Sequence, residues 1–531
     1  MDLHGSKTGA SLLVVVLAAA GLAAVGGGAV LGRAADRGRR PSVVMIMTDD
    51  QWFGSLRAMP RTRALIGDAG TRFDRYHASM PLCCPSRSTY LSGRFAHNNG
   101  VRHNMAPLGG YDRLDERNTL PVWLRKAGYT TSHIGKYPNG YGKKNPRHVP
   151  PGWDEWRGSV DPTTYRMWGY RLNENGRLTT YGHPDVEDPA LYQTDVYRDK
   201  AIDFITRRSR EGRPFFLDVA FLAPHSEGRR RRGEPKPEVR KAPRPAPRHR
   251  GAFAREPLPR PPSFDEADVS DKPPFLRARP RLDRRTVDAI TASYRGRLAS
   301  LLAVDEAVEK IVAALRANGR LADTYLLFTS DNGFLFGQHR IPSGKFVAYE
   351  ASSHVPMLMR GPGIPPGGVS RELVGNADLA PTIAAIASAR PTHALDGRSL
   401  LPFARDPRRR TARPILHEAA EGAGTASRAA PDDVSAGRQA AQGDLDQDGP
   451  SHPVRGNGAS AGYEAIRTER YLFVRYSRGG AELYDLRADP HELDSRHDDP
   501  RYARVRRYLE DRLDELQRCA GDACGHEVGE P

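Results

Sequence analysis

Three short apolar runs along the chain end abruptly in polar residues. The runs are Val43 to Met47, Phe215 to Phe221 and Thr324 to Phe328. Continuous apolar runs of this length are typical of strands that are buried on both faces of a parallel sheet. The polar residues that follow the three runs are Thr48-Asp49-Asp50-Gln51, Ala223-Pro224-His225 and Thr329-Ser330-Asp331-Asn332. Because ligands of open α/β sheets bind beyond the carboxyl ends of the strands, we expect these residues to converge on one site.

Segments with apolar residues at helical spacing lie between the predicted strands, at 120–127, 198–208 and 295–315. Alternation of strands and helices predicts a large, mainly parallel sheet sandwiched by helices, the α/β class. Near the C-terminus the pattern changes to the alternation of antiparallel strands, at 463–467, 471–476 and 482–485, followed by an amphipathic helix at 502–516. We therefore predict a small C-terminal α+β subdomain.

Shifts in composition suggest the boundaries between these parts. Residues 225–280 are rich in Arg, Pro, Glu and Lys, which predicts a long surface loop, and residues 421–461 have the low-complexity composition of a flexible insert. The predicted organisation is an N-terminal segment at 1–36, a catalytic domain at 41–415, the insert at 421–461, the C-terminal subdomain at 462–518 and a tail at 519–531.

The N-terminal segment has the features of an export signal. Lys7 precedes an apolar stretch at residues 11–31, and small residues follow it. This pattern fits a cleaved secretory signal, and the stretch is also long enough for an uncleaved membrane anchor. Both interpretations place the folded part outside the cytoplasm.

Charge and cysteine content narrow the function classes. The chain of 531 residues has 80 Lys and Arg against 64 Asp and Glu, and its pI is about 9.8, so its surface favours anionic partners. Charge is the only feature that would favour nucleic acid, and no nucleic-acid-binding motif accompanies it. Four cysteines exclude a disulfide scaffold, although Cys519 and Cys524 could pair in an oxidising compartment. The vicinal Cys83 and Cys84 would form a disulfide only with strain.

The segment Cys83-Cys84-Pro85-Ser86-Arg87, followed by Ser88-Thr89-Tyr90-Leu91-Ser92-Gly93-Arg94, resembles the signature of the type I sulfatases. The resemblance implies an alkaline-phosphatase-like sulfatase fold and hydrolysis of sulfate esters. It also implies that a formylglycine-generating enzyme oxidises Cys83 to formylglycine (3-oxoalanine). One hydroxyl of the hydrated aldehyde would attack sulfur, and the other would expel sulfate by re-forming the carbonyl. Further stretches, including Asn376 to Thr382 and Leu483 to Leu486, resemble N-acetylglucosamine-6-sulfatases and heparan-type sulfatases more than arylsulfatases.

Four residues match the metal site of that family: Asp49, Asp50, Asp331 and Asn332. All four offer hard oxygen ligands, which favour calcium or magnesium over zinc, and the resemblance favours one calcium ion with Cys83 beside it. The cation would lower the pKa of the attacking hydroxyl.

Four more residues match catalytic positions of the family. Arg87 resembles the arginine that orients formylglycine, Lys136 and Lys345 resemble the two lysines that bind sulfate, and His225 resembles the histidine at the leaving group. We take His225 as the candidate general acid.

One departure from the family pattern concerns the residue two positions after Lys136. Many sulfatases have a histidine there, and this chain has Pro138. His97 could replace it, although a structural role fits His97 equally well. His133 and His339 are more typical of packing histidines than of ligands.

Together these features predict a secreted or membrane-anchored sulfuric ester hydrolase. We expect it to act on a sulfated sugar such as glucosamine 6-sulfate in a glycosaminoglycan. Two alternatives remain open: a phosphate or phosphonate ester hydrolase of the same superfamily, and a non-catalytic protein that binds polyanions through the basic segment Arg229 to Arg250.

Overall fold

A large mixed sheet forms the centre of the protein, whose computed structural model describes residues 40–227, 239–420 and 462–529. The sheet has ten strands in the order β11-β2-β10-β9-β1-β8-β4-β5-β6-β7. Its central strands are β9 (Thr324–Ser330), β1 (Ser42–Thr48), β8 (Phe215–Ala220) and β4 (Thr130–Gly135). These four are mutually parallel. β1, β8 and β9 are the three predicted strands, and β4 was not predicted.

The outer strands extend the sheet on both sides. On the β9 side they are β10 (Met357–Arg360), β2 (Thr71–Phe73) and β11 (Gly368–Ser370). On the β4 side they are β5 (Glu155–Ser159), β6 (Tyr170–Glu174) and β7 (Arg177–Tyr181). β10, β6 and β7 pair antiparallel, so the sheet is mainly but not entirely parallel. A separate two-stranded sheet joins β3 (Tyr76–His77) to β12 (Val374–Gly375).

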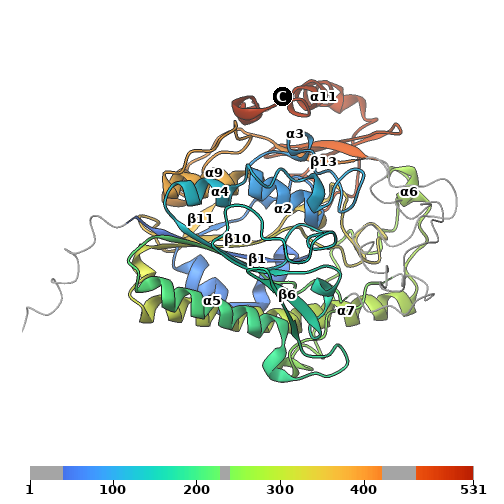
Figure 1. Ribbon diagram of the computed structural model, residues 1–531. Helices are drawn as coiled ribbons and strands as arrows, with labels where there is room; N and C mark the ends of the chain where they lie inside the picture. Colours follow the sequence, from blue (N-terminus) through green and yellow to red (C-terminus); the bar gives the residue numbers. More distant parts are fainter. Residues whose placement is uncertain (1–39, 228–238, 421–461, 530–531) are drawn as a thin grey trace, which may run out of the picture. The chain divides into compact units, whose positions relative to one another are not determined.

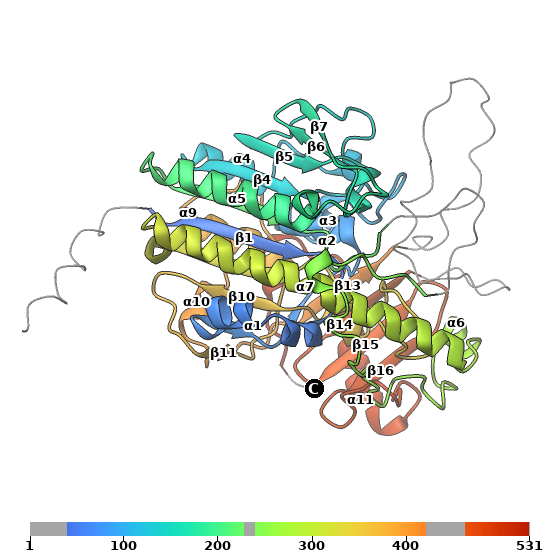
Figure 2. The ribbon, with the colours of Figure 1, turned by 90° about the horizontal axis from the view of Figure 1, so that it is seen from below.

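Alternate side chains of β1 pack into two cores, because successive residues of a strand point to opposite faces. Val43, Met45 and Met47 belong to one apolar core, and Val44 and Ile46 belong to the other. Helices cover both faces (Figures 1 and 2). The first face carries α2 (Cys83–Ser92), α4 (Leu120–Lys126) and α9 (Leu379–Ala387), and the second carries α5 (Gln193–Ser209) and α7 (Arg284–Ala317). This arrangement confirms the predicted sandwich.

Short helices complete the main domain: α1 (Pro60–Thr62), α3 (Ala96–Asn99), α6 (Pro274–Arg277), α8 (Glu350–Ser353) and α10 (Leu401–Arg405). The described part of the predicted loop at 225–280 contains little regular structure beyond α6. Its Arg229 to Arg232 run lies outside the described residues, as do the N-terminal segment and the segment 421–461.

A second, antiparallel sheet forms the C-terminal part in the order β13-β14-β15-β16. Three of its strands were predicted, namely β14 (Tyr463–Arg467), β15 (Tyr471–Tyr476) and β16 (Ala481–Asp485). The fourth, β13 (Ile415–Ala419), precedes residues 421–461 in sequence and pairs with β14. Helix α11 (Ala503–Leu516) packs on this sheet, and a disulfide joins Cys519 to Cys524.

Among the described residues, no helix is both long enough and apolar enough to cross a membrane.

Candidate active site

Four neighbouring parallel strands deliver polar residues to one edge of the sheet. Asp49 and Asp50 follow β1, Asp331 and Asn332 follow β9, and these two strands are hydrogen-bonded neighbours. Lys136 follows β4 directly, and His225 lies five residues beyond the end of β8. The side chains meet because the carboxyl ends of parallel strands share an edge.

The carboxylates form a connected group that excludes solvent. The Asp50 N–H donates to Asp331 Oδ1 at 3.2 Å, and Asn332 Nδ2 donates to Asp50 Oδ1 at 2.7 Å. Asp50 has a left-handed backbone conformation with φ of 61°, which Asp tolerates better than most residues. This conformation turns the chain at the end of β1, so that consecutive residues Asp49 and Asp50 both contribute to the group.

Cys83 begins α2 and is completely buried against the carboxylates. Its Sγ donates to Asp49 Oδ1 at 3.4 Å and accepts from Lys345 Nζ at 2.9 Å. One ligand atom from each of Asp49, Asp50, Cys83 and His225 can be chosen so that all four lie within 4.8 Å of one another. Because Cys83 is the first residue of α2, the partial positive charge of the helix N-terminus also favours an anion beside its side chain.

Three cationic side chains contact this group. Arg87 Nε donates to Asp331 Oδ2 at 2.8 Å, and its Nη2 donates to Asp49 Oδ2 at 3.2 Å. Lys136 forms an ion pair with Asp49, and Lys345 forms one with Asp50. Lys345 Nζ also lies 3.3 Å from Asn332 Oδ1. The cations that the sequence predicted are therefore gathered around Cys83 and the carboxylates.

Electrostatics differ between the carboxylates. Burial opposes ionisation of Asp49, but the charges of Lys136, His225 and Arg87 outweigh it and lower the pKa of Asp49 below its ordinary value. Burial, together with the negative charge of Asp49, raises the pKa of Asp331. The raised pKa of Asp331 means that an additional positive charge would stabilise the fully ionised group.

His225 has a fixed ring orientation. Its Nδ1 lies 2.7 Å from the carbonyl oxygen of Ser226, which can only accept, so Nδ1 carries a proton. Nε2 lies 3.7 Å from Asp50 Oδ2 and so faces the carboxylate group. Nε2 is therefore the atom that could exchange a proton with a bound substrate.

The residues present fit a hard divalent cation. Three buried carboxylates and one amide oxygen converge from the ends of two neighbouring strands, and such oxygen sets are typical of calcium or magnesium sites. The raised pKa of Asp331 agrees with this assignment. Cys83 and His225 lie close enough to add one sulfur and one nitrogen atom, but the oxygen atoms outnumber them, which favours calcium or magnesium over zinc.

One buried cation at the site was not predicted. Arg297, on α7, lies with its Nη2 3.8 Å from Asp50 Oδ2 and donates from the same nitrogen to Ser226 Oγ at 3.0 Å. Its guanidinium stacks 3.6 Å from the ring centre of Phe334. Burial lowers the pKa of Arg297 to about 10, and attraction to Asp50 offsets part of this effect. The sequence did contain one indication of this role, because Arg297 lies among the apolar positions of the helix predicted at 295–315.

Three other histidines are bonded to residues outside the carboxylate group. His97 Nδ1 pairs with Glu418 at 3.2 Å, and its Nε2 donates to the carbonyl oxygen of Cys519 at 3.0 Å. These contacts attach α3 to the C-terminal part, so we withdraw His97 as the replacement for the missing histidine. His133 bonds to Asp218, and His339 bonds to Glu266, in line with packing roles.

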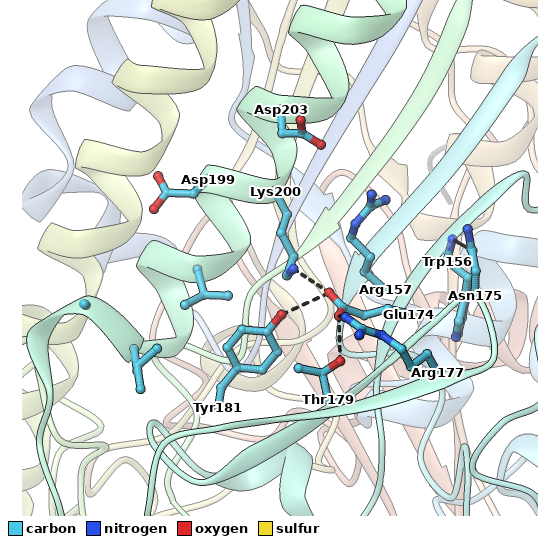
Figure 3. Close-up of a pocket in the computed structure, with 13 residues that line it drawn as sticks. Trp156, Arg157, Glu174, Asn175, Arg177, Thr179, Tyr181, Asp199, Lys200 and Asp203 are labelled. Atoms are coloured by element: carbon cyan, nitrogen blue, oxygen red, sulfur yellow. Dashed lines mark hydrogen bonds and ion pairs between the residues drawn. The ribbon is translucent and has the colours of Figure 1, made fainter.

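Two surface cavities lie apart from the carboxylate group of Asp49, Asp50 and Asp331. The larger, of about 760 Å³, lies between α5 and the β6–β7 hairpin (Figure 3). Glu174, in the lining of this cavity, accepts hydrogen bonds from Lys200 and, at 2.7 Å and 3.0 Å, from Thr179 and Tyr181. The charges of Glu174 and Lys200 are therefore already paired with each other. The smaller cavity, of about 310 Å³, includes Gly140 in its lining. None of the predicted site residues lines either cavity.

Comparison with known proteins agrees with this geometry. The sequence matches the family described as Sulfatase over residues 41–389, and the family described as N-sulphoglucosamine sulphohydrolase, C-terminal, over residues 455–519. It is 33% identical over 547 residues to an arylsulfatase of Volvox carteri, covering 96% of this chain and 79% of the relative. It is 32% identical over 512 residues to an N-acetylglucosamine-6-sulfatase of Capra hircus, covering 92% of this chain and 86% of the relative.

A solved structure shares the fold. The structure of BT4656 in complex with its substrate D-glucosamine-2-N,6-O-disulfate aligns with a TM-score of 0.69 and 22% identity. The alignment covers 90% of this chain and 98% of that chain.

Proposed function

The chain belongs to the sulfatase family of sulfate-ester hydrolases, and on this premise we propose that it cleaves the 6-O-sulfate of a glucosamine unit in a sulfated polysaccharide. The observation that carries its hydrolytic role is the grouping of Asp49, Asp50 and His225 around Cys83. Asp331 accepts from the Asp50 N–H, and Lys136 and Lys345 pair with Asp49 and Asp50. This arrangement combines a nucleophile position, oxygen ligands for a cation and positive groups for an anionic ester.

Asp49, Asp50, Asp331 and Asn332 would hold one calcium ion, with the side chain of residue 83 beside it. Calcium supplies a positive charge that polarises the sulfate group, and formylglycine supplies a hydrated aldehyde whose hydroxyl is the nucleophile. Residues of the chain itself bind the sulfate group and transfer the proton. Lys136 and Lys345 bind sulfate oxygens, since their ammonium groups already lie at the carboxylates that surround Cys83.

Proton transfer belongs to His225 in this proposal. Its protonated Nδ1 is held by the Ser226 carbonyl, so Nε2 is the atom that donates a proton to the departing sugar oxygen. Arg87 fixes two of the carboxylates from within α2 and thereby sets the position of residue 83 relative to the cation. A sugar oxygen is a poor leaving group, so protonation by His225 is worth most for a sugar ester.

Maturation requires a partner enzyme that oxidises Cys83 to formylglycine. Cys83 is fully buried, so we infer that this enzyme acts before the main domain has folded. Export before folding is compatible with this order, and we propose that the folded part works outside the cytoplasm, either secreted or anchored through residues 11–31. The composition of the N-terminal segment supports this localisation.

The substrate proposal has two supports of different kinds. The Capra hircus relative is named an N-acetylglucosamine-6-sulfatase, and the C-terminal part matches a family named for N-sulphoglucosamine sulphohydrolase. The net positive charge of the chain also favours a polyanionic sugar polymer. The equally similar arylsulfatase of Volvox carteri makes simple aryl sulfates the necessary comparison substrates.

The non-catalytic alternative relies on the basic segment Arg229 to Arg250. In its described part, Arg244 pairs with Glu227 and Arg248 pairs with Asp195. These arginines already have carboxylate partners, so they favour a structural role over a polyanion-binding surface. The phosphate or phosphonate alternative uses the same site, and only relative rates separate it from sulfate hydrolysis.

The decisive experiment is a substrate panel applied to protein whose Cys83 peptide has been weighed by mass spectrometry. The panel contains glucosamine 6-sulfate, sulfated oligosaccharides, 4-nitrophenyl sulfate and 4-nitrophenyl phosphate. We expect the highest kcat/KM on 6-O-sulfated glucosamine. A higher kcat/KM on the phosphate ester would overturn the proposal, as would complete absence of sulfate release by protein that carries formylglycine.

A further inference from the structure

Tyr165 contacts both of the side chains that the proposed mechanism places at the sulfate and the leaving group. It ends the short helix η4 (Thr163–Tyr165), and its side chain is buried. The Lys136 ammonium lies 4.8 Å from the centre of the Tyr165 ring. On the same ring, the centre of the His225 imidazole lies 5.1 Å away at an interplanar angle of 50°.

The hydroxyl of Tyr165 is anchored to the segment that contains Lys136. Asn139 Nδ2 donates to the Tyr165 hydroxyl at 2.8 Å. The Gly140 N–H donates to Asp161 Oδ2 at 2.6 Å, and the Asp161 N–H donates to the Tyr141 carbonyl at 3.1 Å. The segments 136–141 and 161–165 are thus hydrogen-bonded to each other at several points, so the ring has little freedom to move.

This arrangement bears on the histidine that the chain lacks. Pro138 stands at that position, and His97 is bonded to Glu418 instead. From its two contacts, we propose that Tyr165 is a positioning residue that fixes the ammonium of Lys136 and the imidazole of His225 in their working orientations. The inference rests on the proposed function, because the roles of Lys136 and His225 come from it.

Two physical effects support this role. The face of a tyrosine ring attracts an ammonium group, so it favours one position of the Lys136 side chain. Contact with the same ring restricts rotation of His225, whose Nε2 donates to the leaving oxygen only while Nδ1 keeps its bond to Ser226. Loss of the ring should therefore weaken both proton donation and sulfate binding. The effect on the rate should be larger for substrates whose leaving group needs the proton.

The leaving group provides the test. An ester of a sugar hydroxyl needs a proton from His225, whereas 4-nitrophenolate leaves without one. We expect Tyr165→Leu to lower kcat/KM for glucosamine 6-sulfate by about 100-fold, the scale of lost general acid catalysis. For 4-nitrophenyl sulfate, which senses chiefly the loss of the cation–π contact, we expect a decrease of about 10-fold or less. Tyr165→Phe keeps the ring and should stay within about fivefold of the wild type on both esters.

Tyr192→Leu is the matched control. Tyr192 is equally buried, belongs to the same apolar core and has its hydroxyl bonded to the Arg244 carbonyl. It should change both rates by the same factor. Tyr165→Met, whose unbranched side chain adapts more readily to the space left by the ring, repeats the measurement if Tyr165→Leu does not fold. Formylglycine content is measured in each preparation by peptide mass.

Each outcome has a definite meaning. A loss that is at least fivefold greater on the sugar ester than on the aryl ester supports the inference. Equal losses on both esters, no loss, or the same selectivity in Tyr192→Leu would overturn it while sulfatase activity itself stands. A wild-type protein that carries formylglycine and hydrolyses no sulfate ester would overturn both the proposed function and this inference.

Discussion

Lowering the pH should destabilise the protein through a group of three histidines, two buried and one half-buried, at the contact between the main domain and the C-terminal sheet. His77, His354 and His417 make up this histidine group. The ring centre of His77 lies 5.0 Å from the ring centre of His354 and 5.6 Å from that of His417. His417, on β13, is fully buried, and its Nδ1 donates to the Ala78 carbonyl at 3.1 Å. Among the described residues, its Nε2 has no hydrogen-bond partner.

The magnitude follows from the pKa of His417. Burial lowers this pKa to about 4, although the charge of Glu350 opposes the shift. In the unfolded chain, histidine has a pKa of about 6.5. The unfolded state therefore binds more protons between these values, so the stabilising contribution is present above pH 6.5 and is lost as the pH falls towards 4. Linkage gives a loss of about 2 kcal/mol between pH 7.5 and pH 5.0 from His417 alone.

The assay is urea unfolding at both pH values for the wild type and for His417→Asn. Asn can still donate to the Ala78 carbonyl, because its amide occupies the place of Nδ1, but it does not titrate. We expect His417→Asn to be less stable than the wild type at pH 7.5, by roughly 1–2 kcal/mol, because it leaves a cavity. Its further loss at pH 5.0 should be smaller than that of the wild type by about 2 kcal/mol.

His183→Asn is the control, because His183 is exposed and its replacement should leave the pH dependence unchanged. The reasoning is refuted if His417→Asn loses as much free energy of unfolding as the wild type between the two pH values. His77 has its pKa lowered well below the ordinary value by burial, so it should retain part of the acid sensitivity in this variant.

Three further predictions concern the site and the C-terminal sheet. Asp331→Asn keeps the shape of the side chain but removes one charge, so we expect a decrease of about 1000-fold in sulfate release and weaker calcium binding by titration calorimetry. Arg297→Met should lower the free energy of unfolding by about 3 kcal/mol because it removes one of the buried cations that balance Asp50 and leaves Lys345, and urea unfolding with Arg297→Lys as the comparison measures this. Glu482→Leu should cost about 3 kcal/mol in the same assay, and Glu482→Gln about 1 kcal/mol, because the buried Glu482 carboxylate accepts bonds from three tyrosine hydroxyls, those of Tyr349, Tyr476 and Tyr484.

The central strands could be predicted because burial on both faces leaves a simple mark on the sequence. β1, β8 and β9 are continuous apolar runs, and each was predicted within two residues of its observed bounds. The start of α7 was predicted too late, at 295 instead of Arg284. Its first turns are polar and exposed, and the signal for its start is the cap at Asp283, whose side chain accepts from the Thr286 N–H at 2.7 Å.

The pairing of β13 with β14 could not be predicted, because strands that are far apart in sequence carry no local pattern that identifies their partner. β13 is only five residues long and contains His417 and Glu418, and its partner β14 begins beyond residues 421–461. The choice of partner depends on which edge of the C-terminal sheet is available after folding, and that edge is defined by residues far from β13 in sequence. For this reason the C-terminal sheet was predicted with three strands, and the fourth was found only in the structure.

The same contrast explains which site residues could be predicted. Asp49 and Asp331 follow predicted strands that are parallel neighbours, so topology brings them together. Lys136 was predicted from the family resemblance, because the strand before it, β4, was not predicted. Arg297 and Tyr165 reach the site from a helix face and from an irregular segment, where position depends on side-chain packing and on a few hydrogen bonds. If these two residues control orientation as we infer, then substrate selectivity should vary with the elements around the strand ends, while the ligands at the strand ends determine whether sulfate is released at all.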